Sequence, residues 1–149
     1  GLHVTWIPSY GPEMRGGTAN CTVILSEDEI GAPVISHPLS AIVFNAPSME
    51  KYAPLVRPGG LLLVNASLIA AKTSRDDLRA LYIPASDIAT ELGNIRIANM
   101  VLLGAYIAVT GIVGLDSARA QLDEHLSDRQ RKWLQPNFEA LDRGAALVR

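Results

Sequence analysis

The fold is decided by residues 41–65, which read AIVFNAPSMEKYAPLVRPGGLLLVN. Residues 41–44 and 61–64 are uninterrupted apolar runs, a pattern typical of strands that are covered on both faces in a parallel sheet. Between them, residues 49–56 carry apolar side chains at helical spacing, and residues 57–60 (RPGG) turn the chain. The stretch therefore predicts a strand, a crossover helix and a second, parallel strand.

Further elements extend this unit toward the C-terminus. Residues 81–83 predict a third strand, and Pro84 separates it from a helix that Gly93 ends. The apolar run 97–115 is long enough to be considered as a membrane span, but its glycines and its flanks without a basic loop favour a buried helix. The fold class expected is a three-layer, open, mostly parallel sheet with helices on both faces and a helical C-terminal half.

Small residues recur within the apolar run. Gly104, Ala108 and Gly111 fall at positions i, i+4 and i+7 and form a narrow strip where another backbone can approach closely. Packing of this helix on the sheet explains the strip better than a dimer seam does.

Asparagine follows each of the two decisive strands, at Asn45 and Asn65. A right-handed crossover brings both residues to the carboxyl edge of the sheet, where open α/β folds bind ligands. The same residues are also common as turn formers that cap strand ends, so a binding role and a capping role both remain open.

Residues 10–21, YGPEMRGGTANC, form the most specified loop of the chain. The β-rich runs 4–7 and 22–25 enter and leave it and are expected to be buried strands. Paired glycines, a proline and two opposite charges indicate a contact surface for a ligand or a partner. The candidate residues in it are Tyr10, Gly11, Pro12, Glu13, Arg15, Gly16, Gly17, Thr18 and Asn20.

Composition limits the function further. The 149 residues are expected to form one domain, and a net charge of −2 without a basic block argues against nucleic acid as a partner. The single cysteine, Cys21, excludes an internal disulfide and a clustered thiolate site, and is expected to be a small buried hydrophobe. The three histidines are widely separated, so no metal site is expected.

No complete catalytic set is visible. The sequence has no Gly-x-Ser-x-Gly motif, and its glycine pairs precede strands rather than helices, so neither forms a phosphate-binding loop. This pattern indicates a subunit that completes an active site with other chains.

Three separated motifs, within residues 4–21, 44–48 and 56–68, closely resemble the gamma subunit of 2-oxoacid:ferredoxin oxidoreductases. The likeness continues through residues 83–85, 91–94 and 99–105. It implies a role in the oxidative decarboxylation of a 2-oxoacid with coenzyme A, which yields an acyl-CoA and reduced ferredoxin. By resemblance, the variant of the loop motif with Met14, Asn20 and Cys21 leans toward 2-oxoglutarate or branched-chain 2-oxoacid enzymes.

The resemblance also implies partners and cofactors. Thiamine diphosphate, magnesium and iron–sulfur clusters would be held by alpha, beta and ferredoxin-like subunits, with none bound by this chain alone, in a cytoplasmic complex without a membrane partner. The loop would face the shared active site near coenzyme A, where Arg15 could pair with a phosphate or with a carboxylate of a partner. A stand-alone nucleotide-binding or coenzyme A-binding module is the alternative.

One departure from the family pattern concerns the N-terminus. Family members open with a strand, a Gly-x-Gly-Gly-Gln-Gly loop and a helix, and this chain begins where that helix ends. We therefore expect residues 1–149 to form a single gamma-type domain that is incomplete at its N-terminus, with one strand fewer in its sheet.

Overall fold

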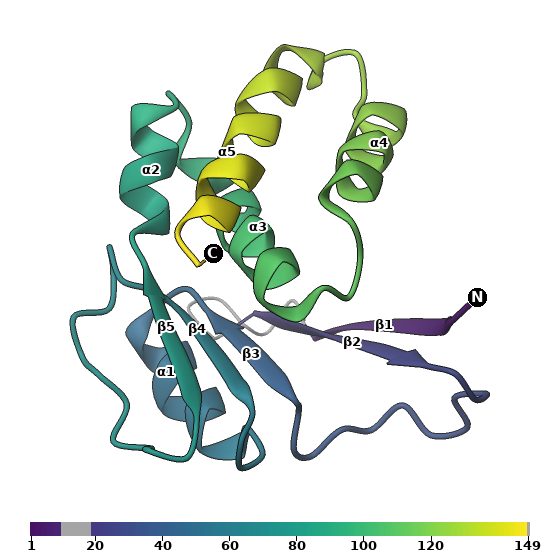
Figure 1. Cartoon of the computed structure of the whole chain (residues 1–149), viewed down its shortest axis with the longest axis vertical. Helices are drawn as coiled ribbons and strands as arrows, with labels where there is room; N and C mark the ends of the chain where they lie inside the picture. Colours follow the sequence, from purple (N-terminus) through teal and green to yellow (C-terminus); the bar gives the residue numbers. More distant parts are fainter. Residues whose placement is uncertain (10–18, 149) are drawn as a thin grey trace.

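The computed structural model describes residues 1–9 and 19–148 (Figure 1). A parallel three-stranded sheet forms its centre, in the order β3 (Ser40–Val43), β4 (Leu61–Asn65) and β5 (Arg79–Ile83). Ser40 pairs with Leu61 and Leu61 with Arg79, so the three strands start in register. The predicted parallel sheet is confirmed.

Strand β4 is the middle of the sheet, and all five of its residues are buried. Leu61 and Leu63 belong to a core cluster on one face, and Leu62 and Val64 belong to a second cluster on the other face. Because side chains alternate along a strand, an uninterrupted apolar run is what a strand covered on both faces requires. The predicted three-layer arrangement is therefore confirmed.

Helix α1 (Ala46–Tyr52), extended by the 3₁₀ turn η1 (Ala53–Leu55), covers one face of the sheet. Met49 and Ala53 contribute buried side chains to the core cluster on that side. Gly59 takes a φ of 75° in the turn that leads into β4, a conformation that glycine adopts cheaply. The chain from β3 through α1 to β4 is thus the strand, crossover helix and strand that the sequence predicts.

Helices α2 (Ala85–Glu91), α3 (Ala98–Thr110) and α5 (Leu134–Ala146) lie over the opposite face (Figure 1). The turn η2 (Ile95–Ile97) joins α2 to α3, and the predicted stop of α2 is confirmed, since Gly93 follows it with a φ of 85°. Helix α3 contributes Val101, Leu102 and other fully buried residues to the core. Among the described residues, no helix is both long and apolar enough to cross a membrane.

The small-residue strip of α3 packs on a helix, so our prediction of a helix-on-sheet contact is wrong at Gly104. A Cβ at Gly104 would overlap the Leu141 carbonyl oxygen of α5, and a Cβ at Gly144 would overlap the Val101 carbonyl oxygen of α3. Each of the two helices therefore has a glycine where the backbone of the other helix comes closest. Gly111 has another role, since it ends α3 with a φ of 63°.

Helix α4 (Leu115–His125) is the least buried helix, with no buried residue of its own. It connects to α5 through the turn η3 (Arg131–Trp133). Arg119 of α4 forms ion pairs with Asp116 on its own helix and with Asp142 on α5. The Arg119–Asp142 pair links α4 to α5, and as an exposed ion pair it contributes at most about 1 kcal/mol.

Strands β1 (His3–Ser9) and β2 (Asn20–Ser26) form a separate antiparallel hairpin (Figure 1). Our prediction that they are buried is wrong, because Val4, Trp6, Val23 and Leu25 are exposed while the residues between them are half-buried. Cys21 lies on the exposed face too, so its predicted burial is also wrong. The hairpin stands beside the parallel sheet, and no element in the described part of the chain buries the face that carries Val4, Trp6, Val23 and Leu25.

Candidate functional site

The hairpin fixes both ends of the candidate loop. Ser9 at the end of β1 pairs with Asn20 at the start of β2, so the two stems of the loop are held together. Asn20 is half-buried at this position. The other candidate residues of the loop, from Tyr10 to Thr18, lie outside the described residues.

Asn45 lies directly after β3 and serves as the N-cap of α1. Its side-chain oxygen accepts a hydrogen bond from the Ser48 backbone N–H at 2.9 Å, which satisfies one of the free donors in the first turn of the helix. From the sequence, both a capping role and a ligand-binding role were possible for Asn45. The hydrogen bond to Ser48 shows the capping role.

Asn65 ends β4 and is almost fully buried, with 1% of its surface exposed. Its amide nitrogen donates to Ser86 Oγ at 2.8 Å, and the Ser86 backbone N–H donates to Asn65 Oδ1 at 3.3 Å. The pair joins the carboxyl end of β4 to the first turn of α2. Asn45 and Asn65 thus lie at the same edge of the sheet, and the Asn65 amide is committed to the internal pair with Ser86.

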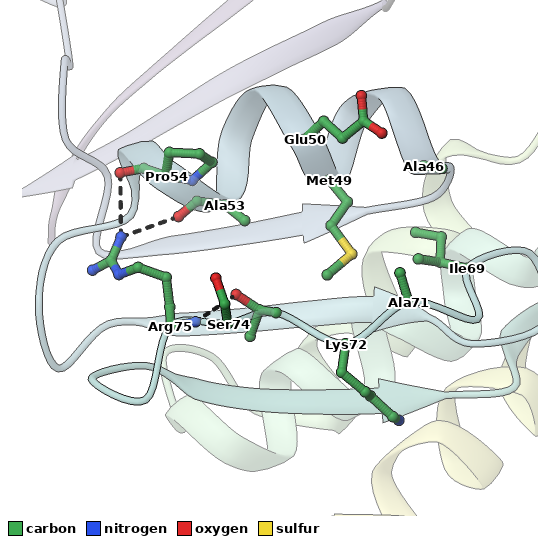
Figure 2. A pocket seen from close by; sticks show the side chains of 11 residues that line it. Ala46, Met49, Glu50, Ala53, Pro54, Ile69, Ala71, Lys72, Ser74 and Arg75 are labelled. Atoms are coloured by element: carbon green, nitrogen blue, oxygen red, sulfur yellow. Dashed lines mark hydrogen bonds between the residues drawn. The ribbon is translucent and has the colours of Figure 1, made fainter.

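A pocket of about 350 Å³ lies next to α1 (Figure 2). Ala46, Met49 and Ala53 line it from the helix side, and Ile69, Ala71 and Ser74 line it from the segment that joins β4 to β5. The lining also includes five polar residues, namely Glu50, Lys72, Thr73, Ser74 and Arg75. The pocket therefore presents apolar and charged side chains together.

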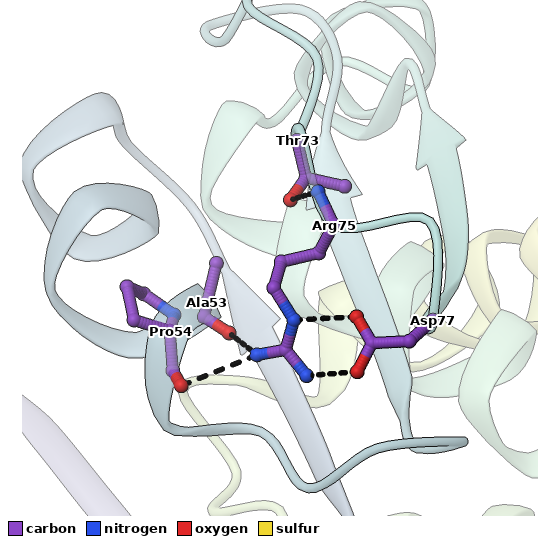
Figure 3. A network of polar contacts seen from close by, with 5 residues as sticks. All are labelled: Ala53, Pro54, Thr73, Arg75 and Asp77. Atoms are coloured by element: carbon purple, nitrogen blue, oxygen red, sulfur yellow. Dashed lines mark hydrogen bonds and ion pairs between the residues drawn. The ribbon is translucent and has the colours of Figure 1, made fainter.

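The Arg75 side chain lies at one end of this pocket and donates four hydrogen bonds (Figure 3). Its Nε and Nη2 atoms each donate to the Asp77 carboxylate at 2.5 Å, and its Nη1 donates to the carbonyl oxygens of Ala53 and Pro54 at 3.3 and 3.2 Å. The hydrogen bonds from Arg75 lower the pKa of Asp77, and those to Asp77 raise the pKa of Arg75. The Arg75 guanidinium group therefore joins the segment between β4 and β5 to the turn η1.

Lys72 and Thr73 come shortly before Arg75 in the chain, and both contact Tyr82 of β5. The Lys72 ammonium lies 3.4 Å from the centroid of the Tyr82 ring, and the Tyr82 hydroxyl accepts a hydrogen bond from the Thr73 backbone N–H at 2.8 Å. Sequence reasoning missed residues 72–77 as an ordered unit. The only signal was a short run of Lys, Thr, Ser, Arg and Asp between two strands, which resembles an ordinary polar loop.

The described part of the chain does not fit the inorganic cofactors that the resemblance implies. Across residues 1–9 and 19–148, no group of three or more His, Cys, Asp and Glu side chains is placed to hold a metal ion. The whole sequence contains one cysteine, whereas an iron–sulfur cluster takes about four cysteine ligands.

A parallel sheet with helices on both faces and an asparagine at the end of two strands defines an open α/β domain. Residues 1–147 match the sequence family described as pyruvate ferredoxin/flavodoxin oxidoreductase. The chain belongs to this family, and the resemblance inferred from the motifs is confirmed.

The chain covers very different shares of two curated relatives. It is 38% identical to ketoisovalerate oxidoreductase subunit VorA of Methanothermobacter marburgensis, over 100% of this chain and 31% of VorA. It is 31% identical to 2-oxoglutarate synthase subunit KorC of Methanothermobacter thermautotrophicus, over 99% of this chain and 80% of KorC. The chain thus spans about a third of the VorA relative and most of the KorC relative.

A solved structure has the same fold. The gamma subunit of a keto/oxoacid ferredoxin oxidoreductase from Geobacter sulfurreducens superposes with a TM-score of 0.79 at 25% identity, covering 99% of this chain and 80% of that one. The expected fold class is therefore confirmed over nearly the whole chain.

Proposed function

We propose that this chain is the gamma component of a thiamine-diphosphate-dependent 2-oxoacid:ferredoxin oxidoreductase. Such an enzyme oxidatively decarboxylates a 2-oxoacid with coenzyme A, forming an acyl-CoA and carbon dioxide and passing two electrons to ferredoxin. The observation that carries the proposal is the match of residues 1–147 to the oxidoreductase family, together with the coverage of 80% of KorC, which is named as a subunit.

The chain contributes structure rather than redox chemistry. Thiamine diphosphate, magnesium and iron–sulfur clusters belong to the alpha, beta and ferredoxin-like subunits in this proposal. The single cysteine of this chain supports that assignment for the clusters, because an iron–sulfur cluster takes about four cysteine ligands. The assembled enzyme passes its electrons to ferredoxin and operates in the cytoplasm. The lone cysteine is consistent with a reducing compartment.

The loop between β1 and β2 forms one wall of the shared active site, on the side of coenzyme A. Ser9 and Asn20 pair at the end of the hairpin, so the two described ends of the loop lie next to each other. A guanidinium such as that of Arg15 suits a coenzyme A phosphate because it can donate two parallel hydrogen bonds. The substrate is 2-oxoglutarate or a branched-chain 2-oxoacid, as the names of KorC and VorA suggest.

Co-expression tests the proposal. The tagged complete chain, produced together with the subunits encoded beside it, is expected to co-purify with thiamine-binding partners, and the purified complex is expected to contain thiamine diphosphate. The isolated chain is expected to give no measurable heat with coenzyme A in calorimetry. Tight binding of coenzyme A by the isolated chain, with no partner recovered, would instead support a stand-alone binding module.

A further inference from the structure

We draw no further inference here: the strongest candidate, the mostly apolar groove between α3 and α4 that Leu103, Leu122 and Leu126 line, carries nothing because nothing in the structure shows what covers it.

Discussion

At the scale of single residues, the structure places polar side chains where they join elements. Asn65 is buried at the end of β4, and both ends of its amide are paired with Ser86 on α2. A buried amide costs free energy unless its donors and acceptors find partners. The Asn65–Ser86 pair therefore fixes the first turn of α2 against the sheet.

Asn65→Ala is expected to lower the free energy of unfolding by about 2 kcal/mol, because it leaves the buried Ser86 groups without a partner. Urea unfolding followed by circular dichroism measures the change. In a double-mutant cycle, Ser86→Ala is expected to cost less in the Asn65→Ala background than alone. Additive losses would mean that the two side chains do not interact.

Asp77→Asn is expected to remove a pH-dependent part of the stability. Arg75 lowers the pKa of the folded-state Asp77 carboxyl, so this group stabilises the fold above its unfolded-state pKa, about 4, and loses that contribution as the pH falls through its folded-state pKa. The difference in stability between the unaltered chain and Asp77→Asn should therefore be largest near neutral pH and shrink toward pH 3. A difference that stays constant across this range would exclude the ion pair as its cause.

Arg15→Ala in the assembled complex is expected to raise the Michaelis constant for coenzyme A, or to lower turnover, by about tenfold, which is typical for the loss of a charge-assisted hydrogen bond. Steady-state kinetics with the purified complex measures the effect, and the circular dichroism spectrum of the isolated chain should not change. Arg57→Ala, in the turn before β4, is the control and should leave the kinetics unaltered. Equal kinetics for both variants would make the loop an ordinary surface loop.

At the scale of elements, the contact between α3 and α5 depends on two glycines. Gly104 lies against the Leu141 carbonyl and Gly144 against the Val101 carbonyl, so the two helix backbones approach at two reciprocal points. Well-packed interiors tolerate added methyl groups poorly because neighbouring backbone cannot move aside cheaply. This pair of contacts explains why glycine occurs twice within helices, where it costs about 1 kcal/mol relative to alanine.

Gly104→Ala and Gly144→Ala are each expected to destabilise the fold by about 3 kcal/mol, since a Cβ at either position overlaps backbone of the facing helix. Thermal unfolding measures the loss. Gly114→Ala is the matched control, because a Cβ there meets only the Ser117 hydroxyl at 3.6 Å. Equal melting temperatures for Gly104→Ala and Gly114→Ala would contradict the close approach of α3 and α5.

Elements could be predicted from the sequence where all local signals indicate the same secondary structure. Residues 41–65 form the expected strand, helix and strand because apolar runs, helical spacing and a glycine turn agree with one another. For residues 4–7 and 22–25 the predicted strands are confirmed but their predicted burial is wrong, because strand propensity does not reveal whether another layer covers the strand. The partner of Gly104 was missed for a similar reason, since a small-residue strip does not specify the surface that approaches it.

At the scale of the whole molecule, the chain combines a three-layer body with an exposed hairpin (Figure 1). The body has two core clusters and holds its own polar groups, such as Asn65 and Arg75, in internal contacts. The hairpin presents an apolar face and leads into the candidate loop. The chain therefore divides into a body that folds around its own core and a hairpin that holds the ends of the candidate loop.

Reconstitution of the enzyme tests the central claim most directly. The measurement is the rate of ferredoxin reduction by the partner subunits, with and without this chain, in the presence of coenzyme A and either 2-oxoglutarate or a branched-chain 2-oxoacid. We predict reduction that requires the chain, coenzyme A and a 2-oxoacid together, and none from the chain alone. Equal rates without the chain, or a complete complex that oxidises none of these 2-oxoacids, would contradict the account.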